Sequence, residues 1–211
     1  MKTVILDLCG GTGAWSRPYA KAGYSVVIVD PKDIKEDTNA FLMQMTVEEY
    51  LEKATIVANA TNRDPIVKGI LCAPPCTHFS GSGAQYWKAK DADGRTDEHL
   101  RIVDACLDLI DLFEPVWWVL ENPVGRLPKL RQNRLGEPLV RFQPYEYGDP
   151  WKKRTCLWGN FTIPEKNPVE PIRSTKQGSW VQKLGGGSKD RRKLRSITPQ
   201  GFAKAFFEAN P

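Results

Sequence analysis

A cysteine follows an apolar run and two prolines in the segment Ile70–Ser80, whose sequence is ILCAPPCTHFS. In open α/β sheets, ligands bind beyond the carboxyl ends of buried strands. The prolines stiffen the approach to Cys76 and fix the direction of its thiol, and a covalent nucleophile needs such preorganisation. We therefore interpret Cys76 as a candidate nucleophile. The alternative is that it is a small buried residue, the usual role of a free cysteine.

A carboxyl group closes a second apolar run, in the segment Trp117–Pro123 with the sequence WWVLENP. Burial favours the protonated form of a carboxyl group, and a protonated Glu121 can donate a hydrogen bond to a ring nitrogen. The alternative is an acid that only caps a helix or a loop. The sequence predicts that Glu121 and Cys76 serve the same site, because both follow buried strands.

A glycine-rich turn lies near the start of the chain, in the segment Asp7–Ser16 with the sequence DLCGGTGAWS. Such a turn lets the backbone approach a cofactor closely and points helix amides at its polar groups. The G-G-x-G spacing differs from the dinucleotide pattern G-x-G-x-x-G, which disfavours a hydride cofactor. Asp30 ends the next apolar run, where an acid can accept hydrogen bonds from ribose hydroxyls.

The elements that position these groups alternate between strand and helix. Apolar runs predict strands at residues 3–8, 25–29, 67–73, 116–120 and 155–158. Helical spacing and caps predict helices at 16–22, 46–53, from Thr96 to just before Pro115, and at 199–208. Residues 77–95 are predicted to be a loop, residues 124–150 to be extended, and residues 162–194 to be irregular and basic. This order predicts a doubly wound, Rossmann-like α/β sheet in a single domain over 1–211.

The composition fits an ordinary globular protein, with 41% hydrophobic and 26% charged residues among 211. No apolar stretch approaches the about 20 residues that span a bilayer, so we expect a cytoplasmic protein that does not enter membranes. Five cysteines without a secretory signal argue against a disulfide framework, and their spacing predicts no metal site. The net charge is −6 over residues 1–121 and +11 over 122–211, which favours a polyanionic partner such as DNA.

The three motifs occur in order, and on them the chain resembles the DNA cytosine-5 methyltransferase family, most of all its small phage-type members. The D-x-x-x-G-x-G-like loop that binds S-adenosylmethionine in that family is matched within Asp7–Ser16. The family motif P-C-x-x-F-S is matched by Pro75–Ser80, and its E-N motif by Glu121 and Asn122. The resemblance implies an S-adenosylmethionine-dependent enzyme with a Rossmann-like sheet.

Two looser matches lie in the second half. Lys152–Thr155 stand where the family has a Q-x-R-x-R strand, and Arg195–Pro199 resemble its last motif, which returns to the cofactor pocket. The resemblance implies that Cys76 adds to C6 of a cytosine while Glu121 binds the N3/N4 edge. A basic residue then offsets charge at O2, and the sequence leaves open whether it is Lys153 or Arg154.

The resemblance also implies a set of cofactor contacts. They are Asp7, Leu8, Gly10, Thr12, Gly13, Trp15, Asp30, Ala73 and Pro74, with Ser196 and Thr198 from the last motif. Trp15 has an alternative role in core packing. In duplex DNA the target base must leave the stack, and we expect the loop at 77–95 to close over it.

One departure from the family concerns substrate recognition. The family usually carries a large target-recognition region, whereas this chain has only the basic segment 160–194 in that place. Such a segment can grip phosphates without reading bases. The same chemistry on RNA or on a free cytosine nucleotide is therefore an alternative, as is a catalytically inactive relative that only binds nucleic acid. A dinucleotide-dependent oxidoreductase would leave the cysteine and Glu-Asn motifs unexplained.

Overall fold

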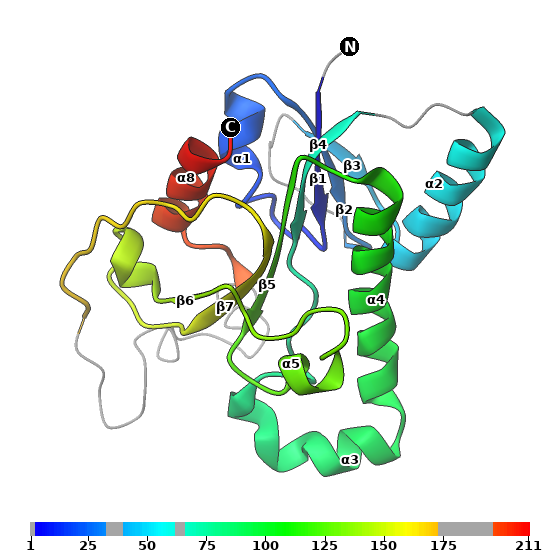
Figure 1. Cartoon of the computed structure of the whole chain (residues 1–211). Coiled ribbons are helices and arrows are strands. Elements are labelled where there is room, and N and C mark those ends of the chain that lie inside the picture. Colours follow the sequence, from blue (N-terminus) through cyan, green and yellow to red (C-terminus); the bar gives the residue numbers. More distant parts are fainter. Residues whose placement is uncertain (1–2, 33–39, 62–65, 173–195) are drawn as a thin grey trace.

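A seven-stranded sheet organises the computed structural model, which describes residues 3–32, 40–61, 66–172 and 196–211 (Figure 1). The strand order is β3-β2-β1-β4-β5-β7-β6. Strands β3, β2, β1, β4 and β5 run parallel, whereas β7 is antiparallel to both β5 and β6. The strands are β1 (Val4–Leu8), β2 (Ser25–Val29), β3 (Phe41–Met43), β4 (Val67–Cys72), β5 (Trp117–Pro123), β6 (Val140–Phe142) and β7 (Thr155–Asn160). The expected doubly wound α/β class is confirmed.

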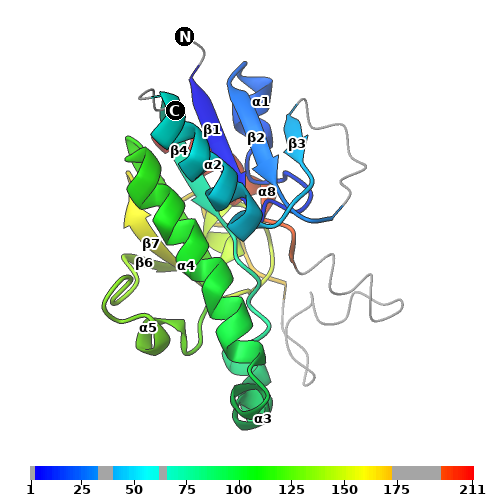
Figure 2. The same cartoon turned by 90° about the vertical axis from the view of Figure 1, so that its right-hand side faces the viewer.

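Helices cover both faces of this sheet (Figures 1 and 2). Helices α2 (Val47–Thr61) and α4 (Arg95–Phe113) pack on one face, and α1 (Arg17–Lys21) and α8 (Gln200–Ala209) on the other. Shorter helical segments lie beyond the strands' carboxyl ends or near β6; they are η1 (Gly81–Tyr86), α3 (Trp87–Ala92), α5 (Leu127–Leu130) and η2 (Pro144–Tyr147). The two-sided covering explains why the central strands are apolar on both faces.

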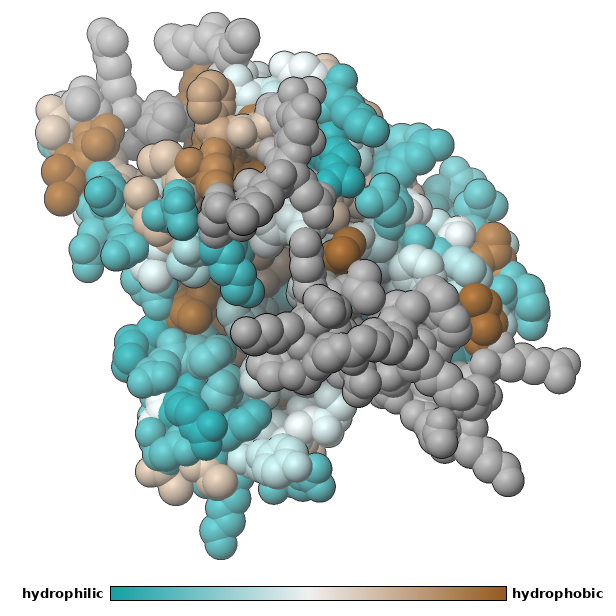
Figure 3. All heavy atoms as spheres, turned by 180° about the vertical axis from the view of Figure 1, so that it is seen from behind, coloured by the Kyte–Doolittle hydropathy of each residue, from teal (hydrophilic) through white to brown (hydrophobic). Residues whose placement is uncertain are grey.

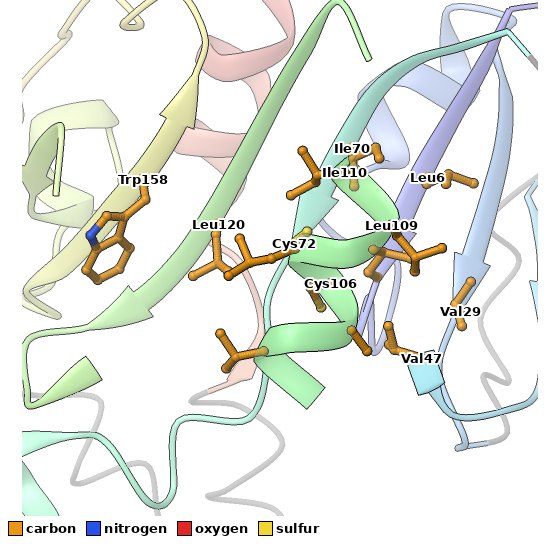
Figure 4. Close-up of a cluster of buried hydrophobic side chains, with 14 of the residues drawn as sticks. Leu6, Val29, Val47, Ile70, Cys72, Cys106, Leu109, Ile110, Leu120 and Trp158 are labelled. Atoms are coloured by element: carbon orange, nitrogen blue, oxygen red, sulfur yellow. The ribbon is translucent and has the colours of Figure 1, made fainter. Parts of the chain in front are cut away.

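Alternate residues of each central strand enter opposite cores. In β1, Leu6 and Leu8 face the core under α2 and α4, whereas Ile5 faces the core under α1 and α8. Strand β4 repeats this alternation, because Cys72 joins the first core and Leu71 the second. Figure 4 shows the first core, where side chains of β1, β2, β4 and β5 meet α4.

Helix α2 begins with the capping pattern expected from its sequence. The Thr46 amide donates to Glu49 Oε2 at 2.8 Å, and the Glu49 amide donates to Thr46 Oγ1 at 3.2 Å. The two bonds satisfy amides that the helix itself leaves unpaired. The helix runs on to Thr61, well beyond the predicted end at residue 53.

Three local predictions are wrong. Residues 77–95 contain η1 and α3 rather than a continuous loop, because contacts with the rest of the protein hold a polar, glycine-rich stretch in helical form. Helix α4 starts after Gly94, which has φ of 79°, and Thr96 lies inside its first turn and donates to Asp91 Oδ1 at 2.6 Å instead of capping. Residues 124–150 include α5, β6 and η2, where prolines occupy first-turn positions that helices accept.

The short edge strand β3 was not predicted. It has only three residues, and its Phe41 side chain is exposed, so no buried alternation marks it in the sequence. From behind, hydrophobic residues lie in separate groups among hydrophilic ones (Figure 3). Within the described ranges, no helix is long and apolar enough to cross a membrane.

The second core depends on an aromatic cluster centred on Phe202 of α8. Its ring stacks on Phe142 at 4.2 Å between centroids and also contacts Trp15 and Tyr147. We expect Phe202→Ala to lower the free energy of unfolding by about 3–5 kcal/mol, because the lost contacts leave a cavity. Urea denaturation at constant m-value measures this change.

Phe41→Ala is the matched control, because the same side chain is 72% exposed on β3. Its removal should change the free energy of unfolding by at most about 0.5 kcal/mol. Equal losses for the two variants would contradict the assignment of Phe202 to the core.

Candidate active site

The three sequence motifs meet along one edge of the sheet. Strands β1, β4 and β5 are parallel neighbours, so the segments that follow them leave at the same edge. Figures 1 and 2 both place α3 beyond these carboxyl ends. The sheet therefore brings the glycine-rich turn, Cys76 and Glu121 to one side of the molecule.

The glycine-rich turn is held by the acid that ends β2. The Gly11 amide donates to Asp30 Oδ2 at 3.0 Å, and the Lys32 amide donates to Asp30 Oδ1 at 2.9 Å. Gly11 and Gly13 have φ of 55° and 65°, which side chains with a Cβ rarely adopt. A Cβ built on Gly11 would meet no atom within 4 Å, so the turn is open on that side.

Asp7 lies beneath this turn rather than on its open side. Its carboxyl is buried and accepts a hydrogen bond from Ser16 Oγ at 2.5 Å, while its Oδ1 has no partner among the described atoms. Gly10 passes directly over it, because a Cβ there would lie 2.6 Å from Asp7 Cγ. Burial raises the pKa of Asp7 to about 7; the nearby Asp30 charge also raises it, and the Ser16 bond opposes both.

The segment that carries Cys76 is fixed through its backbone. The Asn122 side chain donates from Nδ2 to the Pro74 carbonyl at 3.0 Å. The Cys76 carbonyl accepts from the amides of Phe79 at 3.0 Å and Ser80 at 2.9 Å, which forms a tight turn. Cys76 itself is half-buried and is not in a disulfide. The E-N motif thus orients the residues leading into the candidate nucleophile.

The segment after β4 is also joined to the segment after β5. Ser80 and Gly125 form an antiparallel bridge. The Gly81 amide donates to the Val124 carbonyl at 3.0 Å, and the Arg126 amide to the Phe79 carbonyl at 2.9 Å. A Cβ on Gly125 would lie 1.8 Å from the Phe79 carbonyl oxygen, so only glycine allows this approach.

Glu121 pairs with a lysine that lies just before β7. Lys153 Nζ lies 3.6 Å from Glu121 Oε1, and both side chains are largely buried. The β5–β7 register pairs Pro123 with Thr155, so the segment that leads into β7, which includes Lys153, lies beside the end of β5. Arg154 is exposed, and its carbonyl accepts from the Val124 amide at 3.4 Å.

The remaining predicted cofactor contacts lie in different settings. Leu8 is buried, and its carbonyl accepts from the Ala73 amide at 3.0 Å, which ties the ends of β1 and β4 together. Thr12 is half-buried in the turn, whereas Trp15 is buried against the aromatic rings of α8. Exposed Ser196 and half-buried Thr198 lie in the segment before α8.

The basic segment expected to replace a recognition region is only partly described. Residues 173–195 lie outside the described residues. Between 161 and 172 the chain forms no helix or strand, and the amides of Asn167 and Val169 donate to carbonyls of η2. No group of three or more His, Cys, Asp or Glu within the described ranges is arranged to hold a metal ion.

The sequence interpretation missed two residues that border the site. His78 is buried, and its ring lies against that of His99, with centroids 3.8 Å apart and planes tilted by 33°. Burial, followed by the positive charge of neighbouring basic groups, lowers the pKa of His78 to about 4. Arg126 bonds to the His78 carbonyl at 3.1 Å. In the sequence, the only feature that marks Arg126 is its place after Gly125, four residues after Asn122 of the E-N motif.

Comparison with known proteins supports the methyltransferase resemblance. A curated relative, the Type II methyltransferase M.DdeI of Desulfomicrobium norvegicum, is 26% identical over 132 residues, which are 62% of this chain and 30% of the relative. A protein described as a DNA modification methyltransferase encoded within an E. coli prophage matches with a TM-score of 0.55 and 19% identity, over 80% of this chain and 53% of that one. The chain has a methyltransferase fold.

This methyltransferase fold agrees with the class expected from the sequence. No protein-family model matches the chain. The chain spans less than a third of the curated relative and about half of the prophage protein.

The buried carboxyl of Asp7 makes stability depend on pH. The folded protein keeps this proton up to about pH 7, whereas the unfolded chain loses it near the usual pKa of 3.8. The free energy of unfolding should therefore fall as pH rises through this window, by up to about 2–4 kcal/mol. Denaturation from pH 4.5 to 8 measures the slope.

Asp7→Asn keeps the shape of the side chain and cannot ionise. It should remove this part of the slope, while other titrating groups, such as Asp149 with its raised pKa, contribute equally to both proteins. Parallel pH profiles for the two proteins would mean that Asp7 is ionised in the folded state.

Proposed function

We propose that this protein transfers a methyl group from S-adenosylmethionine to C5 of cytosine in DNA, with Cys76 as the covalent nucleophile. The observation that carries the proposal is the backbone junction between the segment that follows Cys76 and the one that follows Glu121. This junction holds a thiol and a carboxyl at one sheet edge, beside the glycine-rich turn. We also propose that residues 1–211 form a single methyltransferase domain.

The glycine-rich turn fits a cofactor with ribose hydroxyls and a charged amino-acid end. Its open side at Gly11 leaves room for a ligand, and the Asp30 carboxylate lies at its border. The buried Oδ1 of Asp7 has no hydrogen-bond partner among the described residues, which leaves a free polar atom beneath the turn. S-adenosylmethionine supplies an electrophilic methyl group on a sulfonium. Gly10, Thr12, Gly13, Ala73 and Pro74 would border it, with Ser196 and Thr198 as further contacts.

C5 of cytosine is too weak a nucleophile to take a methyl group directly, and Cys76 would increase its electron density. Its thiolate adds to C6, and the C5–C6 double bond opens so that electron density moves to C5. C5 would take the methyl group as its bond to the sulfonium sulfur breaks, which leaves a neutral thioether. The C5 proton then passes to water, its bonding electrons re-form the double bond, and the bond between Cys76 and C6 breaks with its electrons returning to sulfur. The thiolate leaves unchanged, so the residue is ready for another substrate.

Glu121 and Lys153 stabilise the charge that this addition places on the ring. Glu121 would hydrogen-bond the N3/N4 edge, and the neighbouring ammonium of Lys153 would face O2. The ion pair at 3.6 Å favours Lys153 over the exposed Arg154 as the cation beside the base. Arg154 is better placed to contact a phosphate, which positions a nucleic acid without reading its sequence.

DNA is favoured as the substrate by charge and by the names of similar proteins. Residues 122–211 carry a net charge of +11, which suits the phosphate backbone. The similar prophage protein is described as a DNA modification enzyme, and the curated relative as a Type II methyltransferase. We also propose that the protein is cytoplasmic and that the basic segment 160–194 serves as a reduced recognition region.

Methyl transfer to four acceptors tests the reaction. We expect label from S-adenosylmethionine to appear at C5 of cytosine in duplex DNA, above single-stranded DNA, RNA and dCMP. Cys76→Ala should abolish transfer, because about 10⁴-fold or more is lost with a covalent nucleophile. DNA carrying 5-fluorocytosine should trap an adduct on Cys76, since fluorine replaces the proton that must leave.

Cys156→Ala is the matched control, because this buried thiol lies in β7 and outside the proposed chemistry. It should keep methyl transfer within about threefold of the parent. Transfer that survives in Cys76→Ala would overturn the covalent route. Preference for RNA or dCMP would replace the DNA substrate, and cofactor binding without transfer to any acceptor would indicate an inactive relative.

The choice between the two basic residues can be tested by matched substitutions. Lys153→Met should lower kcat by about 10²-fold, as does the loss of one donor at a developing charge. Arg154→Met should instead raise KM for the polymer several-fold and leave kcat within about threefold. Steady-state kinetics on the preferred acceptor separates the two effects. A larger kcat loss for Arg154→Met would reverse the assignment.

A further inference from the structure

Arg126 makes the densest set of polar contacts near Cys76, although its own side chain is only 11% exposed. Its two terminal nitrogens donate to the two oxygens of Asp91, both at 2.7 Å. One of them also donates to Thr96 Oγ1 at 2.9 Å. Its guanidinium lies over the Trp87 ring, 4.7 Å from the centroid. Arg126 thus binds both ends of α3 and the first turn of α4.

The same arginine reaches the residues that follow the nucleophile. Its Nε donates to the His78 carbonyl at 3.1 Å, and its backbone amide donates to the Phe79 carbonyl at 2.9 Å. The carbonyl between these and Cys76, that of Thr77, accepts from Lys90 Nζ of α3 at 2.7 Å. Three consecutive carbonyls after Cys76 are therefore held by Arg126 or by the helix that Arg126 fixes.

We propose that Arg126 is a positioning residue for Cys76, which locks residues 77–79 and helix α3 into one preformed wall of the site. The effect of Arg126 on catalysis rests on the proposed function. The preformed wall does not, because it is a property of the free protein. It differs from the expectation that residues 77–95 close over the substrate as a loop.

The chemistry of arginine explains why this position needs it. A guanidinium offers a planar fork that pairs with both carboxylate oxygens while a further N–H binds a carbonyl, and it can stack on an aromatic ring. Lysine provides a single ammonium and cannot make these contacts together. The pairing also holds the pKa of Asp91 at about 2, so the carboxylate stays charged at any working pH.

The position of the wall determines what Arg126 contributes to the reaction. A nucleophile displaced by about 1 Å can lose about 10²-fold in rate, and the carbonyls that Arg126 holds lie within three residues of Cys76. Substitution of Arg126 should therefore lower kcat. It should leave the glycine-rich turn intact, because that turn lies on the other side of β4.

Two measurements on the free full-length protein test the wall. Hydrogen exchange should show the α3 amides protected in the parent by about tenfold or more, and Arg126→Gln should lose this protection. The alkylation rate of Cys76 by iodoacetamide, followed on its peptide by mass spectrometry, should change by about threefold or more. In methyl transfer, Arg126→Gln should lower kcat by about 10²-fold with KM for S-adenosylmethionine within about twofold.

Related variants separate positioning from general stability. Arg126→Lys should behave like Arg126→Gln in kcat, and Asp91→Asn should show a smaller loss in the same direction. Either can replace Arg126→Gln if that variant fails to fold. Arg134→Gln is the matched control, because Arg134 pairs with Asp108 and Asp111 on α4, outside the site. It should leave α3 protection and Cys76 alkylation unchanged.

Three results would overturn the inference. The first is a parent protein whose α3 amides are not protected from exchange. The second is an Arg126→Gln variant whose Cys76 alkylation rate and α3 exchange rates stay within about twofold of the parent. The third is an Arg134→Gln variant that shows the same changes as Arg126→Gln. A parent that transfers no methyl group would refute the proposed function instead, and the exchange and alkylation data would still decide whether Arg126 forms the wall.

Discussion

The backbone contact between residues 79–81 and residues 124–126 is the constraint on which the candidate site depends. Phe79 and Gly125 approach so closely that a Cβ at Gly125 would overlap the Phe79 carbonyl oxygen. Two hydrogen bonds and a β-bridge then fix the relative position of the segments. Cys76 and Glu121 precede these two segments, each by three residues. The backbone contact therefore constrains how far apart the Cα atoms of Cys76 and Glu121 lie.

The parallel sheet is what makes this contact possible. Strands β4 and β5 are neighbours and end at the same edge, although α3 and α4 separate them in sequence. Because β7 is antiparallel to β5, it starts beside the end of β5, and Lys153 just before it pairs with Glu121. The segments that follow β4 and β5 and the segment before β7 therefore lie close together, although they are distant in the sequence. The rigid wall proposed for Arg126 is an extension of the same arrangement.

Much of the sheet could be predicted from sequence, because apolar runs bounded by glycine, proline or acid mark buried parallel strands. The turn at Gly10–Gly13, Cys76 and Glu121 followed from those strands. Elements that depend on distant partners could not be predicted in this way. Helix α3 is held by Arg126, thirty-four residues beyond its end, and β3 is an exposed edge with no alternation. The choice of Lys153 required its ion pair with Glu121, a contact between distant segments that periodicity does not encode.

The last helix has a consequence for the order in which the protein folds during synthesis. The Tyr19 hydroxyl donates to the Asn210 carbonyl at 2.8 Å, and the Asn210 side chain exchanges two hydrogen bonds with Thr162. Phe202 and Phe206 fill the core beneath Trp15, immediately after the glycine-rich turn. The glycine-rich turn leaves the ribosome before α8 does, so it gains this packed support only after α8 has been synthesised. A nascent chain that lacks residues 200–210 has an open second core, and it needs protection from aggregation until α8 emerges.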